Sequence, residues 1–536
     1  MFSSDATTIP LDQPLDGARS GPIRRLRGRR ERAVAPALSG GRTGGVALGM
    51  IVGLSLVVVV LAANRPSLLA PTTHYGVYPH WMAGPFGGLL PWMTRNSTVL
   101  KDLFTGALVA MYGGYVVVLR AAPRLPTRWL VGTILAVHAI FLLSPPLALT
   151  DVFNYINYGR MEVLHNLNPY TTIPIYEPHN EPSFILSNWH ELLSPYGPMF
   201  TLLTFVVVPL GVAGSFWALK AVLGLASLAT IYLVWRCAQM LGRNPRSAIA
   251  LIGLNPIVLV WGLGGDHNDF LMIVCIMLGF YLLLRGRESA DSRSAQARRG
   301  HVQSAEEGHP ESRLQWLIRE VWAALRAPAP ADIGAGAAFV LAAGFKASGA
   351  VLLPVVLAGL LRTPRRIPHV LLGMVLMSGA VGVMSLAAFG LHIPDLSTQS
   401  RLVTGESIPN LIGLALGAGG ESEALRYVMS GALIASIALC CRLAWKRRDA
   451  ITASGWASVA LLVTLSWVLP WYVLWVLPLA ALSTSRRLRT AALVIGVYMI
   501  VVWVPISGGV WHALGFRPEN TPLGRLHQRY VRELLN

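Results

Sequence analysis

Charged residues are scarce in this chain. Of its 536 residues only 13% are charged, whereas 54% are hydrophobic. A typical soluble domain carries about 25% charged residues. The apolar runs include many long enough to cross a bilayer, which takes about 20 residues each, and they lack the alternation of transmembrane β-strands. The composition therefore predicts an all-α polytopic membrane protein and excludes an ordinary soluble domain.

Cysteine and lysine are also rare. Lysine occurs only at positions 101, 220, 346 and 446, so nearly all of the basic residues behind the net charge of +18 are arginines. They form short clusters between apolar runs, which is typical of cytoplasmic loops and not of a nucleic-acid surface. We therefore expect a lipid bilayer, and no nucleic acid, as partner. The cysteines lack metal-site or disulfide spacing and are predicted to be small core residues: Cys237, Cys275, Cys440 and Cys441.

No clear cleavage site follows the first apolar run, residues 45–63, which is too long for the core of a signal peptide. We expect a retained signal anchor there. Residues 1–44 are polar, rich in Gly, Pro and Arg, and without apolar periodicity, which predicts a disordered basic cytoplasmic tail. The chain also shows no internal repeat and no glycine-rich nucleotide loop.

The basic clusters divide the apolar runs and set an orientation. With these clusters inside the cell, the multispan domain 45–506 is predicted to cross the plasma membrane about 13 times. Residues 286–331 then form a long cytoplasmic loop. The run 198–212 is short and breaks the alternation, so we expect a re-entrant or interface helix there, although a full crossing stays open. The polar segments expected outside are 64–102, 151–197, 391–426 and the C-terminal tail 507–536.

The stretch LTDVFNYINYGRMEVLHNLNPY opens the main external loop, 151–197. Asp151 follows an apolar run, and a carboxylate at a membrane surface must face water, protein or substrate; it also suits the start of a helix. Asn154 and Tyr155 follow it in this helix and offer the amide and aromatic surface that suits a sugar. The segments NLNPY and SPYGP supply Asn168, Tyr170 and Tyr196, which are turn residues, interface anchors or sugar contacts.

A second polar segment, GGDHND, lies between two apolar runs and holds Asp266, His267, Asn268 and Asp269. These side chains could contact a sugar. Their mixed oxygen and nitrogen ligands make a divalent metal conceivable. No strict ligand spacing supports one, so neither a metal nor another cofactor is predicted.

Two further positions could serve the same external pocket. Lys346 lies between two short apolar runs, where it either reaches toward the outer face or pairs with a lipid phosphate beside the free N–H groups of a broken helix. Trp471 and Tyr472 follow Pro470 at an outer turn. They belong to an interfacial aromatic belt or line an acceptor groove.

These segments in this order resemble a known family. LTDVFNYINYGRMEVLHNLNPY, SPYGP, GLNPIVLVWGLGGDHNDFLM, GFKASGAVLLP and LPWYVLWVLPLAAL are similar to the actinobacterial polyprenol-phosphate-mannose-dependent α-(1→6)-mannosyltransferases of the mannopyranosyltransferase A and B type. The resemblance covers roughly residues 45–510. It implies a C-type glycosyltransferase fold, a lipid-phosphate-linked sugar donor and a catalytic aspartate in the first large external loop.

Asp151 occupies the position of that aspartate. Many relatives carry paired carboxylates there, whereas Val152 follows here, so no metal role is carried over. The resemblance implies transfer of mannose from polyprenyl-phosphate-mannose to an α-1,6-mannan or phosphatidylinositol mannoside-type acceptor, with inversion and Asp151 as general base. Lys346 and, second, Arg160 would bind the donor phosphate.

Two alternatives stay open. The donor could carry another sugar, such as arabinose or glucose. The protein could instead translocate a lipid-linked sugar, although a transporter should show repeats and a site at the bilayer midplane. The polar residues gather at one face instead, which favours an enzyme.

Overall fold

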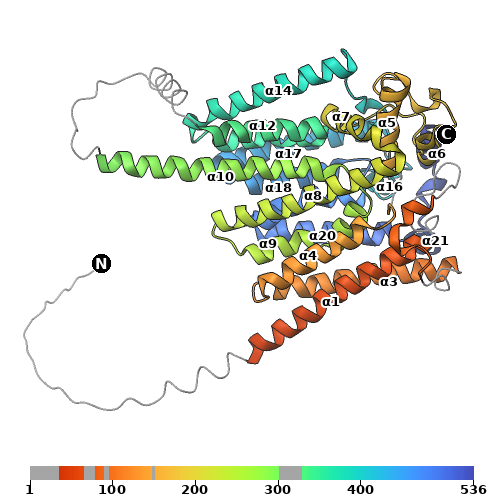
Figure 1. Ribbon diagram of the computed structural model, residues 1–536, viewed down its shortest axis with the longest axis horizontal. Helices are drawn as coiled ribbons and strands as arrows, with labels where there is room; N and C mark the ends of the chain where they lie inside the picture. Colours follow the sequence, from red (N-terminus) through yellow and green to blue (C-terminus); the bar gives the residue numbers. More distant parts are fainter. Residues whose placement is uncertain (1–34, 65–78, 90–95, 148–150, 301–328, 536) are drawn as a thin grey trace, which may run out of the picture.

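The computed structural model describes residues 35–64, 79–89, 96–147, 151–300 and 329–535. These residues form helices and connecting turns, and no β-strand occurs among them. The fold is therefore all-α, which confirms the predicted class (Figure 1).

Six helices are long and apolar enough to cross a membrane, and a bent pair adds a seventh candidate. This confirms a polytopic membrane protein, while the number of crossings stays a prediction. Five shorter apolar helices of 10–17 residues accompany them within the described residues. The long helices are α1 (Ala35–Asn64), α3 (Ser97–Ala121), α8 (Gly211–Met240), α10 (Asp269–Gly300), α14 (Ile367–Phe389) and α17 (Glu423–Arg447), and the bent pair is α20 (Arg486–Trp503) with α21 (Ser507–Ala513).

The short helices lie where the sequence places polar residues inside apolar runs. The predicted span 247–264 is two pieces, α9 (Pro245–Gly253) and a π-helical turn, η5 (Val258–Leu263), because Asn255 and Pro256 break it. The Asn255 side chain accepts hydrogen bonds from the N–H groups of residues 257 and 258 and so caps the second piece. The other short apolar elements are α4 (Thr127–Leu142), α12 (Pro330–Phe345), η7 (Ala347–Leu352) with α13 (Leu353–Leu360), α18 (Ala450–Thr464), and η9 (Pro470–Trp475) with α19 (Leu477–Leu482).

Two predicted boundaries differ from the structure. Helix α1 begins at Ala35, so residues 35–44 are helical and not part of a disordered tail, and residues 1–34 lie outside the described part. Helix α10 runs on to Gly300 and takes up residues 286–300 of the predicted loop 286–331. Residues 301–328 of that loop are likewise outside the described part.

The apolar run 198–212 forms α7 (Pro198–Val207) and η4 (Val208–Leu210). Gly211 then breaks the helix with φ +70°, a left-handed conformation that glycine adopts without strain, before α8 begins. Helix α7 packs on α5 (Asp151–His165). A break at this point agrees with the expected interface helix, and its place in the membrane stays a prediction.

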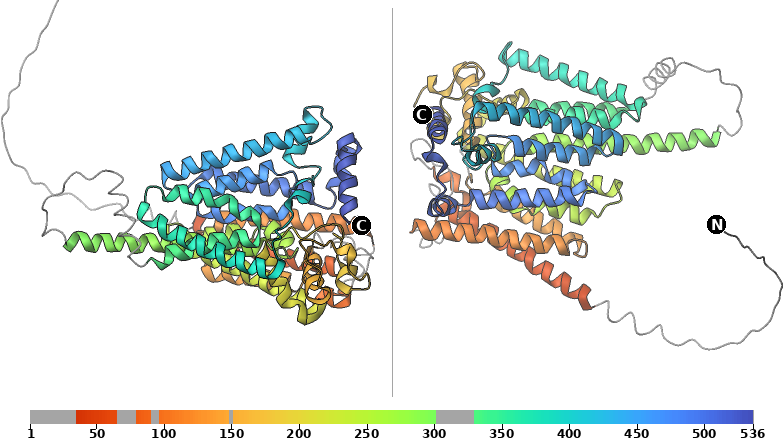
Figure 2. Two further views of the ribbon diagram at one scale, coloured as in Figure 1. Left: turned by 90° about the horizontal axis from the view of Figure 1, so that it is seen from above. Right: turned by 180° about the vertical axis from the view of Figure 1, so that it is seen from behind.

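The basic clusters meet at one end of the bundle. Arg243 interacts electrostatically with both Asp449 and Arg489, and Arg366 pairs with Asp332. Helices α5, α6 (Pro182–Leu186) and α16 (Ile408–Ala415) lie at the opposite end with the C-terminus (Figure 1). In both views of Figure 2 the C-terminus again lies at one end of the helix bundle, opposite the free end of α10. Basic and polar segments are thus segregated, as the positive-inside rule predicts.

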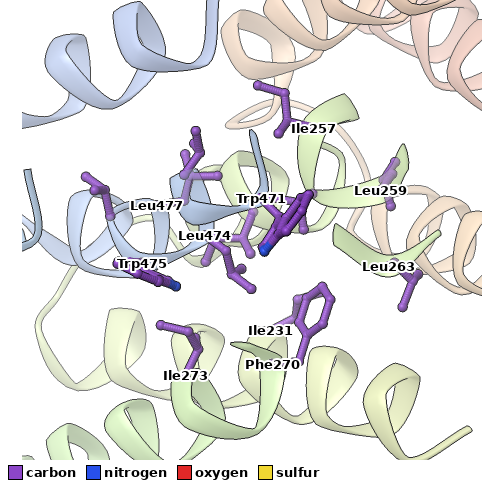
Figure 3. Packing of buried hydrophobic residues seen from close by; sticks show 14 of the residues in the cluster. Ile231, Ile257, Leu259, Leu263, Phe270, Ile273, Trp471, Leu474, Trp475 and Leu477 are labelled. Atoms are coloured by element: carbon purple, nitrogen blue, oxygen red, sulfur yellow. The ribbon is translucent and has the colours of Figure 1, made fainter. Parts of the chain in front are cut away.

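The core beneath the polar end is apolar and aromatic. Figure 3 shows Trp471 of η9 near Phe270 of α10 and on the side of Leu259 and Leu263 of η5, whereas Trp475 lies farther along η9. All five side chains are buried. Two short, irregular helices are therefore fixed by packing against the long helix α10, and they place the segments around residues 266–269 and 471–472 together.

The C-terminal residues 507–535 form a helical cap instead of a tail. After α21, η10 (Pro518–Asn520) leads into α22 (Pro522–Leu535). A Cβ atom at Gly524 would lie 1.9 Å from the Pro518 carbonyl oxygen, so only glycine allows this turn. Leu534 of α22 packs with Trp189, Leu192 and Leu402, which belong to the external loops.

Candidate active site

Asp151 is the first residue of α5, at the polar end of the bundle. Its carboxylate therefore lies at the N-terminal end of the helix, where the backbone N–H groups have no partner within the helix. Phe153 stacks on Phe216 of α8 with 5.7 Å between the ring centroids, and this contact fixes one side of α5. The side chain of Asp151 is 14% exposed, so it is open to a ligand.

A narrow cavity of about 30 Å³, which opens to the outside, lies over Asp151. Seven of the residues singled out from the sequence line it: Asp151, Asn154, Tyr155, Tyr196, Lys346, Trp471 and Tyr472. Sequence reasoning missed the remaining lining residues: Tyr158, Trp189, Leu192, Gln399, Leu402, Trp467 and Leu469. Five separate chain segments thus build one chamber of carboxylate, amide, ammonium and aromatic groups.

His267 lies behind Asp151. Its Nδ1 atom is 3.5 Å from Asp151 Oδ2, and its ring stacks on Trp471 with an interplanar angle of 10°. Both ring nitrogens are buried and make no hydrogen bond to the described residues. The Asn268 amide is also buried and unpartnered. Trp471 therefore fixes the plane of the imidazole, and Nδ1 points toward the carboxylate.

Lys346 is held at a break between α12 and η7, where its backbone is extended. Its Nζ atom lies 2.8 Å from Asp269 Oδ2. The Trp475 indole N–H donates to the other carboxylate oxygen of Asp269 at 2.5 Å. Nζ also lies over the Tyr472 ring, 5.1 Å from its centroid. The ammonium is 19% exposed, so it is both fixed in place and open to an anion.

A wider groove, with about 1770 Å³ of empty space, adjoins the chamber at Lys346. The two share Lys346, Tyr472 and Trp467. Beyond them the groove runs along apolar residues of α17 and α18, including Leu433 and Leu461. Only 11% of the apolar window of α17 is buried, so this side of the bundle is open to a membrane. A charged chamber therefore continues into a largely apolar groove.

Asp266 has a different place from its neighbours in the GGDHND segment. Its carboxylate lies 2.8 Å and 3.1 Å from the Nζ atom of Lys220 in α8, and both side chains are only 1% exposed. Asp266 also has φ +59°, an uncommon conformation for a residue other than glycine. It does not line the chamber. Lys220 was missed, although a lysine inside an apolar run signals a buried partner.

The same geometry can be compared with known proteins. A family model described as alpha-(1→6)-mannopyranosyltransferase, N-terminal domain, matches residues 49–362, which is more than half of the chain, and one described as MptB C-terminal domain matches residues 403–515. The chain belongs to the α-(1→6)-mannopyranosyltransferase family. The resemblance drawn from its motifs is thereby confirmed.

Individual relatives agree with this family. The chain is 28% identical over 394 residues, 70% of each chain, to alpha-(1→6)-mannopyranosyltransferase A of Mycobacterium tuberculosis. It is 29% identical over 162 residues, 29% of this chain and 32% of the relative, to the protein of that name from Corynebacterium glutamicum. No solved structure matches the chain.

Seven residues expected at the site of this mannopyranosyltransferase family member do not line the chamber: Arg160, Asn168, Tyr170, Asp266, His267, Asn268 and Asp269. Arg160 donates to Glu181 at 2.5 Å within the external loop, which does not agree with a role at the donor phosphate. Asn168 donates to the Phe389 carbonyl, and its oxygen accepts from the Tyr170 N–H. Asn168 and Tyr170 therefore hold the loop in shape, the turn alternative that the sequence left open.

The metal question was tested against the same side chains. Within the part of the chain that the structure describes, no group of three or more His, Cys, Asp and Glu residues is arranged to hold a metal ion. Asp266 and Asp269, the oxygen ligands of the conceivable site, instead bind Lys220 and Lys346. The absence of a metal or other cofactor stays a prediction.

Proposed function

We propose that the protein transfers mannose from polyprenyl-phosphate-mannose to an α-1,6-mannan acceptor, with inversion at the anomeric carbon. The observation that carries this proposal is the continuity of three environments. A carboxylate chamber, an exposed ammonium and an apolar groove follow one another through the shared residues Lys346 and Tyr472. A donor made of a sugar, a phosphate and an isoprenoid chain needs these three environments in this order.

Asp151 is the proposed general base. Inversion by a single displacement needs a group that takes the proton from the acceptor hydroxyl as this hydroxyl attacks the anomeric carbon. The Asp151 carboxylate is the exposed acid that lines the chamber. His267 lies 3.5 Å behind it and restricts its orientation.

Lys346 is the proposed phosphate contact. The bond to the anomeric carbon breaks as the polyprenyl phosphate leaves with the bonding electron pair, and a fixed cation stabilises the charge that develops. Asp269 and Trp475 hold Lys346 at the junction of the chamber and the groove. Placing a pre-oriented charge there avoids reorganisation during the reaction.

The proposal includes a location and an acceptor. The segregation of basic loops from the polar chamber supports a plasma-membrane enzyme with its N-terminus in the cytoplasm and its chamber outside. A mannan core of the lipomannan or lipoarabinomannan type, or a phosphatidylinositol mannoside, would then present its hydroxyl from the external side.

The test of the proposed function uses membranes that contain the enzyme, labelled polyprenyl-phosphate-mannose and a short α-1,6-mannoside. Asp151→Asn should lower the transfer rate by about 10²- to 10⁴-fold, because the acceptor hydroxyl loses its base. The control is Asp102→Asn, which changes an exposed carboxylate of α3 in the same way. If Asp151→Asn still transfers mannose at the wild-type rate, Asp151 is not the general base. If the wild-type protein transfers no mannose, the proposed reaction is wrong.

Lys346 gives a separate test in the same assay. Lys346→Met should lower kcat by about 10²-fold, the size of effect seen when one stabilising donor is removed. Lys346→Arg keeps the charge and should retain more activity than Lys346→Met. Equal rates for Met and Arg would exclude a role for the charge. Lys446→Met, at the opposite end of the bundle, is the matched control.

A further inference from the structure

A second groove, with about 900 Å³ of empty space, lies on the far side of the chamber wall. One side is formed by the loop 403–410, with Glu406 and Asn410, and the other by α22. The α22 residues in the groove are 524, 527, 528, 531 and 532. Their spacing of three and four places them on one face of the helix.

This groove and the chamber share a single wall. Leu402 lines the chamber, whereas the next residue, Val403, lines the groove. Leu534 of α22 packs against Leu402 and against Trp189, which also lines the chamber. A chain molecule whose end reacts in the chamber can therefore extend over this wall into the groove.

The groove holds polar groups that the protein itself leaves unused. Among the described residues, the Glu406 carboxylate accepts a hydrogen bond from its own backbone N–H alone, and the side-chain amide of Gln528 has no hydrogen-bond partner. Arg532 donates only to the backbone carbonyl of Gln528, at 3.4 Å. Donors and acceptors are thus available side by side, as the hydroxyl groups of a sugar require.

The charge of the residues that line the groove indicates whether the groove binds a neutral or an anionic ligand. Glu406 and Glu519 both line it, and burial together with the nearby Glu519 carboxylate raises the pKa of Glu406. One arginine, Arg532, lines the groove beside the two carboxylates. The carboxylates outnumber it and so disfavour a phosphate headgroup, whereas hydroxyl groups donate to them. The lining therefore favours a neutral polyhydroxylated ligand.

We propose that this groove binds the already formed part of the acceptor glycan, a neutral α-linked oligosaccharide several residues away from the reacting hydroxyl. The proposal rests on the proposed function, since it names where the rest of the acceptor lies. It predicts that the enzyme favours longer acceptors, and that α22 creates this preference.

Direct binding is the first test. Full-length Asp151→Asn protein in detergent is titrated with a fluorescently labelled hexasaccharide of α-1,6-mannose. Adding Gln528→Ala or Arg532→Ala should weaken binding about fivefold each, the loss of one hydrogen bond. Arg529→Ala is the matched control, because Arg529 is exposed on α22 and does not line the groove. Unchanged affinity in both groove variants would overturn the proposal.

Acceptor length is the second test. In the wild-type background, Gln528→Ala and Arg532→Ala should lower kcat/KM for the hexasaccharide about fivefold while leaving the disaccharide within about twofold. An equal loss for both lengths overturns the groove and indicates a damaged fold. Wild type that transfers nothing overturns the proposed function instead, and the binding titration still decides whether the groove holds the glycan.

Discussion

At the scale of single residues, two ion pairs fix the orientation of the side chains in the GGDHND segment. Asp266 binds Lys220 in the core, and Asp269 binds Lys346 at the chamber. His267 between them is thereby turned toward Asp151. The buried pair is thus a positioning device, and the left-handed backbone at Asp266 is maintained by its contact with Lys220.

The Lys220–Asp266 pair makes a prediction for stability. Lys220→Met leaves Asp266 buried without a partner and should destabilise the protein by about 3–5 kcal/mol, as should Asp266→Asn. The double variant removes both charges and should recover most of this loss. The measurement is the thermal melting of purified protein in detergent, analysed as a double-mutant cycle.

The control for this cycle is His512→Gln, which breaks an exposed ion pair with Glu519 and should change stability by less than about 1 kcal/mol. Additive losses in the double Lys220/Asp266 variant would show that the two charges are not coupled. A drop in transfer rate without a change in donor KM would support positioning.

At the scale of elements, the external loop after α5 contains a titrating group. Glu177 is buried, and its carboxylate oxygens make no hydrogen bond among the described residues. Burial and the neighbouring Glu181 raise the pKa of Glu177 to about 8, and the nearby Asn157 amide offsets this only in part. In the folded loop Glu177 is therefore neutral at pH 7.

This pKa predicts how the stability of the loop depends on pH. Below about pH 4.5 Glu177 is protonated in both the folded and the unfolded chain, so its burial does not make the free energy of unfolding depend on pH there. As the pH rises toward 8, only the unfolded chain ionises, and the folded loop loses stability. Limited proteolysis of the loop should become faster between about pH 5 and about pH 8.

Glu177→Gln provides the check, because it keeps the neutral shape. The variant should resist proteolysis better than wild type at pH 8 and should remove most of the acceleration with pH. Tyr176→Phe, at the exposed neighbouring residue, is the control. If proteolysis of Glu177→Gln accelerates with pH as much as that of wild type, groups other than Glu177 cause the pH dependence.

The elements also show how far the sequence predicts the site. Asp151, Lys346 and the GGDHND segment stand out because a polar residue between apolar runs needs water or a polar partner. Asp151 and Lys346 line the chamber, and His267 and Asp269 of the segment contact them from behind. The role of Arg160 was not predictable, since Glu181 captures it from another part of the loop. Helix α22 was taken for a tail because its partners, Trp189 and Leu402, lie more than a hundred residues away.

At the scale of the whole molecule, the proposed reaction requires that the chamber end of the helix bundle faces outward. The basic loops around Arg243 and Arg489 meet at one end, and the chamber lies at the other. The lipid-linked donor and the mannan acceptor belong to the external side in the proposed reaction. An orientation with the chamber inside would contradict the donor, the acceptor and the location together.

Cysteine labelling tests this orientation. Tyr176, 73% exposed at the chamber end, and Arg447, at the opposite end, are replaced singly by cysteine in a chain whose four native cysteines are serine. A charged maleimide should label Tyr176→Cys in intact spheroplasts, and Arg447→Cys only after permeabilisation, because basic loops are retained inside. The reverse pattern would place Asp151 in the cytoplasm, where the proposed lipid-linked donor does not present its sugar. Because Tyr176 and Arg447 are both exposed in the same protein, accessibility alone would not produce opposite results.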